Sequence, residues 1–98
     1  MEIIKIRDGN RLTIGLSGRL DSNTSPKFEA ELGASLEGIT ELVLDFDQLN
    51  YLSSAGLRVI LGCQKQMNKR GKMTIIHVND IIMEIFTVTG FTEILTIE

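Results

Sequence analysis

Alternating apolar and polar residues open the chain and predict a pair of antiparallel strands. Residues 4–7 and 12–17 alternate between the two kinds of side chain, which is the two-residue period of a β-strand. Residues 8–10, Asp-Gly-Asn, separate the two runs, and Asp-Gly between alternating runs is a strong hairpin signal. We therefore expect a hairpin whose second strand ends near Gly18.

Three later segments carry the period of three to four residues between apolar positions that is typical of helices. Residues that favour a helix start precede each segment, namely Ser25-Pro26, Ser53-Ser54 and Asn79. Ser25 is expected as an N-cap and Pro26 as the first helical position. A glycine that can end the helix follows each segment, namely Gly38, Gly71 and Gly90. The expected apolar faces carry Phe28, Leu32 and Leu36, then Val59, Ile60, Cys63 and Met67, then Ile82, Ile85 and Phe86.

Short apolar runs between these helices predict three more strands. Residues 41–46 and 73–78 are nearly all apolar, as in strands that are covered on both faces. Residues 91–97 are expected to form a final short strand. The resulting order, β-β-α-β-α-β-α-β, predicts an α/β fold in which an antiparallel pair opens a mixed sheet with helices packed on it.

Composition narrows the class of protein and of partner. The 98 residues are 43% apolar, which suits a single globular domain over residues 1–98. Ten basic residues against thirteen acidic ones give a net charge of −3, which argues against nucleic acid or an anionic membrane surface as a partner. Apolar runs are too short to span a bilayer and residues 1–5 do not resemble a signal peptide, so we expect a cytoplasmic protein.

Few residues in the chain could support catalysis or bind a metal. Cys63 is the only cysteine and His77 the only histidine, so a zinc site built from several such side chains is excluded by count. We expect Cys63 to be a buried apolar residue and His77 a partly buried structural residue within a strand. Nucleotide-binding fingerprints and the nucleophile elbow are absent. The sequence therefore predicts no metal and no cofactor.

The junction from Asn50 to Arg58 is the segment most suited to a function. Two hydroxyls, those of Ser53 and Ser54, stand where a helix is predicted to begin. In one interpretation a serine only caps the helix by accepting a bond from a free N–H group. In the other, the same N–H groups and the helix dipole favour an anion, and a serine there can accept a phosphoryl group. The residues alone leave both interpretations open.

Four segments, in order along nearly the whole chain, carry a family resemblance. They are Gly18–Asp21 (Gly-Arg-Leu-Asp), Val43–Phe46 (Val-Leu-Asp-Phe), Tyr51–Leu57 (Tyr-Leu-Ser-Ser-Ala-Gly-Leu) and Thr89–Leu95 (Thr-Gly-Phe-Thr-Glu-Ile-Leu). Together they resemble the STAS domain family, specifically the single-domain anti-sigma factor antagonists. The resemblance implies a single STAS domain over residues 1–98 with a STAS-type mixed sheet.

The resemblance also implies a phosphorylation site. Members of the family are phosphorylated on a serine that stands one or two positions before the motif glycine. In this sequence these two positions are Ala55 and Ser54. Because alanine has no hydroxyl, Ser54 is the expected acceptor. Ser53 stands where the family usually has an acidic residue, which makes Ser53 an alternative acceptor.

The function that the resemblance implies is regulatory, without catalysis by the chain itself. The unmodified protein would bind an anti-sigma factor that is also a serine kinase and so release the sigma factor. Phosphorylation would end the interaction and a serine phosphatase would restore it. The partner-binding residues are expected to be Asp21, Ser22, Asn23, Thr24, Ser53, Ser54, Ala55, Gly56 and Arg58.

Some of these assignments have alternatives. Asp21 is expected either to orient the Ser54 hydroxyl or to be a turn residue, and Arg58 either to contact a partner carboxylate or to be merely solvated. The chain could instead be a STAS interaction subunit of a transport or stress-signalling complex that uses the same surface without phosphorylation. A hydrolase with Ser54 as nucleophile is disfavoured because no base lies nearby in the sequence.

Overall fold

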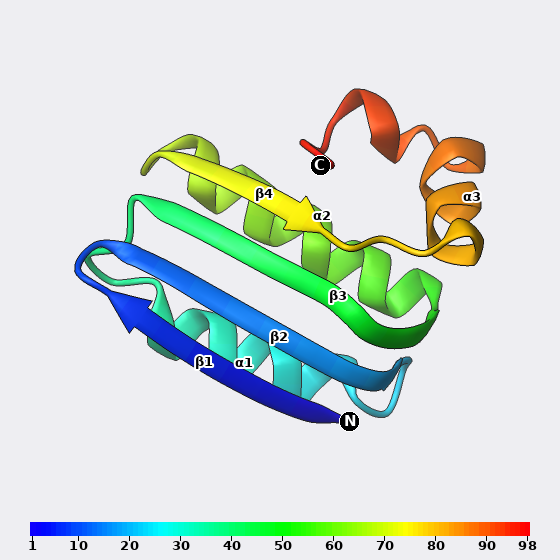
Figure 1. Cartoon of the computed structure of the whole chain (residues 1–98), viewed down its shortest axis with the longest axis horizontal. Coiled ribbons are helices and arrows are strands. Elements are labelled where there is room, and N and C mark those ends of the chain that lie inside the picture. The colour runs from blue at the N-terminus through cyan, green and yellow to red at the C-terminus, as the bar shows by residue number, and fades with distance from the viewer.

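Four strands form one sheet in the order β1-β2-β3-β4 (Figure 1). In the computed structural model, which describes residues 1–98, they are β1 (Glu2–Asp8), β2 (Arg11–Leu20), β3 (Glu41–Leu52) and β4 (Lys72–Ile76). β1 pairs antiparallel with β2, whereas β2 with β3 and β3 with β4 pair parallel. The predicted hairpin and mixed sheet are therefore confirmed.

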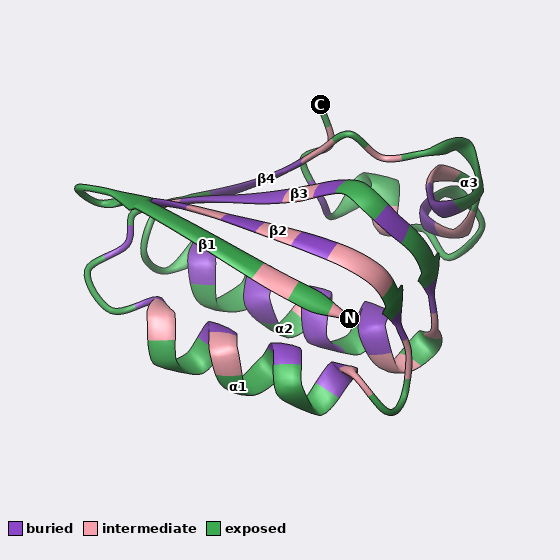
Figure 2. Cartoon of the chain, turned by 60° about the horizontal axis from the view of Figure 1, so that its bottom comes forward, coloured by how far each residue is buried: buried purple, intermediate pink, exposed green.

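Three α-helices and one short 3-10 helix accompany the sheet: α1 (Ser25–Ser35), α2 (Ser54–Asn68), α3 (Asp80–Val88) and η1 (Phe91–Glu93). α1 and α2 lie side by side on one face of the sheet, and α3 lies past the end of β4 (Figure 2). None of these helices has both the length and the apolar character needed to cross a membrane. The opposite face of β1, β2 and β3 carries no helix.

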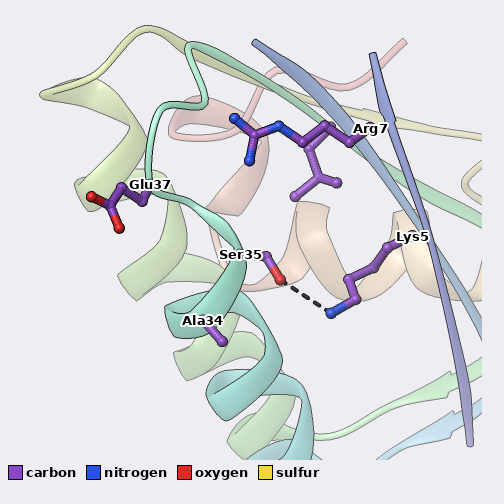
Figure 3. Close-up of a pocket in the computed structure, with 6 residues that line it drawn as sticks. Lys5, Arg7, Ala34, Ser35 and Glu37 are labelled. Atoms are coloured by element: carbon purple, nitrogen blue, oxygen red, sulfur yellow. Dashed lines mark hydrogen bonds between the residues drawn. The ribbon is translucent and has the colours of Figure 1, made fainter. Parts of the chain in front are cut away.

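The two sides of β1 face different surroundings, as the two-residue period of a strand requires. Lys5 points toward α1, where its ammonium group donates a hydrogen bond to Ser35 (Figure 3). It also donates a hydrogen bond to the carboxylate of Glu31. That hydrogen bond from Lys5 holds the pKa of the Glu31 carboxyl below its usual range. Ile4 and Ile6 alternate with Lys5 and consequently point to the face without helices.

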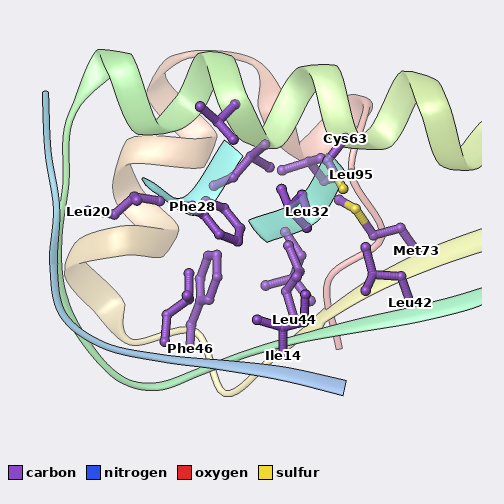
Figure 4. Packing of buried hydrophobic residues seen from close by; sticks show 14 of the residues in the cluster. Ile14, Leu20, Phe28, Leu32, Leu42, Leu44, Phe46, Cys63, Met73 and Leu95 are labelled. Carbon is purple, nitrogen blue, oxygen red and sulfur yellow. The ribbon is translucent and has the colours of Figure 1, made fainter. Parts of the chain in front are cut away.

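The hydrophobic core fills the space between the sheet and the helices. Phe28 of α1 and Phe46 of β3 point into that space (Figure 4), and both are completely buried. Phe86 joins α3 to the same core, with its ring centroid 6.5 Å from that of Phe46. The apolar faces predicted for the helices are buried, except that Ile85 is only partly so. Helix periodicity thus identified the core correctly.

β3 extends six residues beyond the predicted strand, from Glu41 to Leu52. The extension is irregular, since its register with β2 shifts between Gly15 and Ser17 and again between Gly18 and Arg19. Such bulges bend a strand and break the regular alternation of apolar residues. The bend carries the end of β3 to the start of α2.

The predicted final strand over residues 91–97 is wrong as a strand. Gly90 is left-handed (φ 80°), and the next residues turn back as η1, with the N–H of Leu95 donating to the carbonyl of Phe91. Phe91 is partly buried, stacked on Phe86, and Leu95 is buried. These apolar residues are four apart, which is a helical spacing rather than a strand spacing. Only one bridge, between Ile75 and Ile97, remains of the expected pairing.

His77 is also placed differently from the prediction. β4 ends at Ile76, and His77 follows in a left-handed conformation (φ 59°) with an exposed side chain. Its Nδ1 lies 2.9 Å from Oδ1 of Asp45, so the two side chains form a hydrogen bond that is not part of the backbone pairing of the sheet. The chain must turn here because Asn79 caps α3 and its amide also donates to the carbonyl of Leu49.

Candidate functional site

The start of α2 is built by Ser53, which is the N-cap. Its hydroxyl accepts a hydrogen bond from the N–H of Gly56 at 3.3 Å. The N–H of Ser53 donates to the carbonyl of Leu20 at 2.9 Å, so the helix start is tied to the end of β2. A parallel pair of strands that end together places the segments after them side by side. This is why residues far apart in sequence converge here.

Ser54 is the first residue of α2 and is exposed. Because Ser53 makes the cap, the hydroxyl of Ser54 is left facing solvent. The first turn of α2 contains no acidic residue, so its N–H groups and the positive end of the helix dipole are not neutralised by a local carboxylate. The position combines an accessible hydroxyl with a potential that favours negative charge.

Asp21 fixes the turn between β2 and α1. Its carboxylate accepts hydrogen bonds from the N–H groups of Asn23 (2.9 Å) and Thr24 (3.1 Å). The Thr24 bond is the largest cause that holds the pKa of Asp21 below its usual range. The hydroxyl of Thr24 in turn accepts from the N–H of Asp21 and donates to the carbonyl of Arg19. Asp21 therefore acts as a turn residue, and none of these bonds reaches Ser54.

The start of α1 differs by one residue from the prediction. The N-cap is Thr24 rather than Ser25, and Pro26 occupies the second helical position. The hydroxyl of Ser25 donates to the carbonyl of Asp21, and its side chain is buried. The tight turn built by Asp21 thus starts the helix one residue early.

Arg19 and Tyr51 form an exposed pair next to both turns, and this pair was not predicted from the sequence. The guanidinium carbon of Arg19 lies 4.0 Å from the centroid of the Tyr51 ring, and its Nε lies 3.6 Å from Oδ2 of Asp21. The two residues are register partners on β2 and β3. Their position offered some signal, since Arg19 stands two residues before Asp21 and Tyr51 two residues before Ser53. The predicted strands ended near Gly18 and at Phe46, however, and so did not reach this pair.

A shallow depression of about 160 Å³ lies between the first turns of α1 and α2. Ser22, Ala55 and Arg58, all expected at the partner surface, line it together with Glu29. Asn23 is exposed in the adjacent turn, and Gly56 is buried beneath the site. The structure therefore brings the residues of the predicted surface to one end of the molecule.

Other titratable groups lie away from this site. Burial raises the pKa of Asp45, but hydrogen bonds from the Asp47 N–H and from His77 outweigh it and leave the pKa below its usual range. The same bond to Asp45 raises the pKa of His77. Burial raises the pKa of the Cys63 thiol to about 12, as expected of a buried apolar cysteine. No group of three or more His, Cys, Asp or Glu residues is arranged to hold a metal ion.

Curated relatives match most of the chain. BtrV of Bordetella bronchiseptica, which is named as an anti-sigma factor antagonist, is 37% identical over 81 residues, covering 81% of this chain and 70% of BtrV. The anti-sigma-B factor antagonist of Listeria monocytogenes is 31% identical over 98 residues, covering 97% of this chain and 85% of the relative.

Solved structures share the fold at low sequence identity. An anti-sigma factor antagonist from Mycobacterium paratuberculosis superposes with a TM-score of 0.89 at 18% identity, covering 98% of this chain and 83% of that one. SpoIIAA, solved in unphosphorylated and phosphorylated forms, gives a TM-score of 0.78 in both, at 15% and 16% identity. Each comparison covers 99% of this chain, and 87% and 91% of the respective SpoIIAA chains. The family described as STAS domain matches residues 3–98, and the chain belongs to that family.

Proposed function

We propose that this protein is an anti-sigma factor antagonist that works by partner switching. In its unmodified form, the surface around Ser54 binds an anti-sigma factor that is also a serine kinase, and the bound sigma factor is released. Phosphorylation of Ser54 ends the interaction, and a serine phosphatase restores it. The chain itself performs no catalysis in this cycle.

The observation that carries the proposal is that the two adjacent serines differ in their hydrogen bonding and exposure. Ser53 is engaged in capping α2, whereas the Ser54 hydroxyl faces solvent one residue later. A kinase can reach Ser54 without unfolding the helix start. The names of the relatives support the class of partner, and the existence of SpoIIAA in a phosphorylated form supports a phosphate-dependent switch on this fold.

Electrostatics explains how one phosphate could switch binding without refolding the protein. At the N-terminus of α2 the phosphate meets free N–H groups and a favourable dipole, so the folded state tolerates it. In a complex, the same dianionic group would have to be desolvated against the partner. Without a matching cation that costs several kcal/mol, and each 1.4 kcal/mol is tenfold in affinity.

The rest of the surface supplies shape and contacts. The depression between α1 and α2 can receive a side chain of the partner, with Arg58 and Glu29 offering charges of both signs at its rim. Arg19 and Tyr51 are of the residue types enriched at the energetic centres of interfaces, and their stacking holds them in place before binding.

The test is binding of purified variants to the anti-sigma factor kinase of the same organism, measured by calorimetry without ATP. Ser54→Ala should bind like wild type, whereas Ser54→Asp should keep its circular dichroism spectrum and bind at least about tenfold more weakly. Gln66→Glu is the matched control, because it adds a charge at an exposed position near the other end of α2. Unchanged binding by Ser54→Asp would contradict the proposal.

A further inference from the structure

The face of the sheet opposite α1 and α2 is uncovered along β1, β2 and β3 (Figures 1 and 2). Residues that alternate with the core positions of each strand point to this open sheet face. On β1 these include Ile4 and Ile6, whose exposed fractions are 61% and 64%. Two large apolar side chains side by side on an open sheet are a surface that gains from being covered.

One row across the open sheet face consists entirely of charged residues. The strand registers pair Asp8 with Arg11, Arg11 with Glu41, and Glu41 with Lys72. The signs therefore alternate as minus, plus, minus, plus from β1 to β4. Within the row, Glu41 lies 3.9 Å from Arg11 and 3.7 Å from Lys72, whereas Asp8 takes part in no ion pair.

An alternating row with an even number of charges is complementary to its own reversed copy. Two sheets stacked face to face by a two-fold axis that runs parallel to the strands, between β2 and β3, place β1 over β4 of the second copy. Asp8 then faces Lys72 of the second copy, and Arg11 faces Glu41 of the second copy. All four contacts across this row join opposite charges.

The same axis gives acceptable partners in the two neighbouring rows. In one row Ile6 faces Thr74 of the second copy, and Thr13 faces Val43 of the second copy. Val43 and Thr74 are only 4% and 6% exposed in the single chain, so Ile6 and Thr13 supply most of the surface in this row, which carries no charge.

In the next row Ile4 faces Ile76 of the second copy. Gly15 there faces Asp45 of the second copy and leaves room for that carboxylate, which keeps its bonds to His77 and to the N–H of Asp47. No pair of like charges meets in any of the three rows.

We propose that the open sheet face is a self-association surface that takes a second copy of this chain in this two-fold arrangement. Four strands lie about 4.8 Å apart, and successive rows are two residues apart along each strand. Three to four such rows give a footprint of roughly 450 Å² per copy. The total of roughly 900 Å² is below the standard size of a stable interface, so the dimer is weak and sensitive to salt. The inference does not rest on the proposed function, since Ser54 lies outside the face.

Charge reversal tests both the surface and its symmetry, with sedimentation velocity from micromolar to millimolar concentration at low salt. Wild type should dimerise, and Asp8→Lys or Lys72→Glu alone should weaken the dimer by about tenfold or more, because each homodimer acquires two repulsive pairs. An equimolar mixture of the two variants should recover the dimer, as should the double variant, because opposite charges then face each other again.

Matched controls separate this surface from general charge effects and misfolding. Glu84→Lys on α3 makes the same change in net charge as Asp8→Lys at an exposed position outside the face, and should dimerise like wild type. Thermal unfolding confirms that each variant is folded. A wild type that stays monomeric at millimolar concentration would overturn the proposal, as would dimerisation insensitive to Asp8→Lys or a mixture that fails to recover the dimer. None of these measurements involves a kinase, so their failure leaves the proposed function untouched.

Discussion

α2 packs closely on Leu20 and Leu52 of the sheet at Gly56, and replacing Gly56 by alanine tests that packing. A Cβ atom at this position would lie 2.7 Å from Cδ1 of Leu52 and 2.9 Å from Cγ of Leu20. Both leucines are buried, with exposed fractions of 3% and 0%, so neither can move into solvent. Adding one methyl group to a filled core costs about 1–3 kcal/mol.

The helix propensity of alanine offsets part of this cost. Gly→Ala inside a helix stabilises it by about 0.8–1 kcal/mol when nothing else changes. Gly56→Ala should therefore lower the free energy of unfolding by about 1 kcal/mol, the difference between a steric cost near 2 and a gain near 1. For a domain of this size that corresponds to a fall of about 4–8 °C in Tm.

Gly62 provides the matched control on the same helix. A Cβ atom there meets nothing within 4 Å, so Gly62→Ala carries only the gain in propensity and should stabilise the protein by about 1 kcal/mol. Urea denaturation of wild type and both variants gives the two differences directly. If Gly56→Ala stabilised the protein as much as Gly62→Ala, the close packing of α2 on Leu20 and Leu52 would be refuted.

Three further predictions concern titratable groups. His77→Gln should lower the urea midpoint most near pH 5–6 and least near pH 9. Because the pKa of His77 is raised in the folded protein, the stabilisation that His77 contributes is complete below about pH 6.5 and is lost as the pH rises. An equal effect at both pH values would contradict this. Asp21→Ala should have a lower urea midpoint than wild type at pH 7, but the two midpoints should converge at low pH. The lowered pKa of Asp21 means that its carboxylate stabilises the fold, and this stabilisation disappears as the carboxylate is protonated. A difference in midpoint that persists in acid would count against this prediction. Cys63 should resist iodoacetamide at pH 8 until urea unfolds the chain, because burial raises its pKa to about 12, whereas rapid labelling of native protein would refute its burial.

Hydrophobic periodicity predicted most of the fold because most of the helices and strands pack one regular face on the core. Phe28 and Leu32 on α1, and Ile60 and Met67 on α2, all lie at positions that the helical period assigns to the interior. The Asp-Gly hairpin and the cap at Asn79 were also readable, since each depends on residues that are adjacent in sequence. Local rules suffice where local contacts decide.

Residues 91–97 contain β-branched side chains typical of a strand, but Phe91 and Leu95 stand four apart after left-handed Gly90, and the segment turns back as η1. The other errors fall where contacts distant in sequence decide the structure. His77 leaves the strand and lies within hydrogen-bond distance of Asp45, 32 residues earlier. The extension of β3 to Leu52 depends on bulges against β2 that no window of a few residues can reveal.

The candidate site could be predicted only in part, because some of its contacts are local in sequence and others are not. The helix start at Ser53 and Ser54 follows from local sequence, and so does the turn at Asp21. The pairing of Arg19 with Tyr51 does not, because it requires the register between two strands. Which of the two serines has a free hydroxyl also needed the structure, since either could have been the cap.

The position of the phosphate tests the central claim most directly. Wild type, Ser54→Ala and Ser53→Ala would each be incubated with the anti-sigma factor kinase and ATP, and peptides containing the start of α2 mapped by mass spectrometry. We predict phosphate on Ser54 in wild type and in Ser53→Ala, and none in Ser54→Ala. Phosphate on Ser53, or on neither serine with a kinase shown to be active on another substrate, would contradict the account.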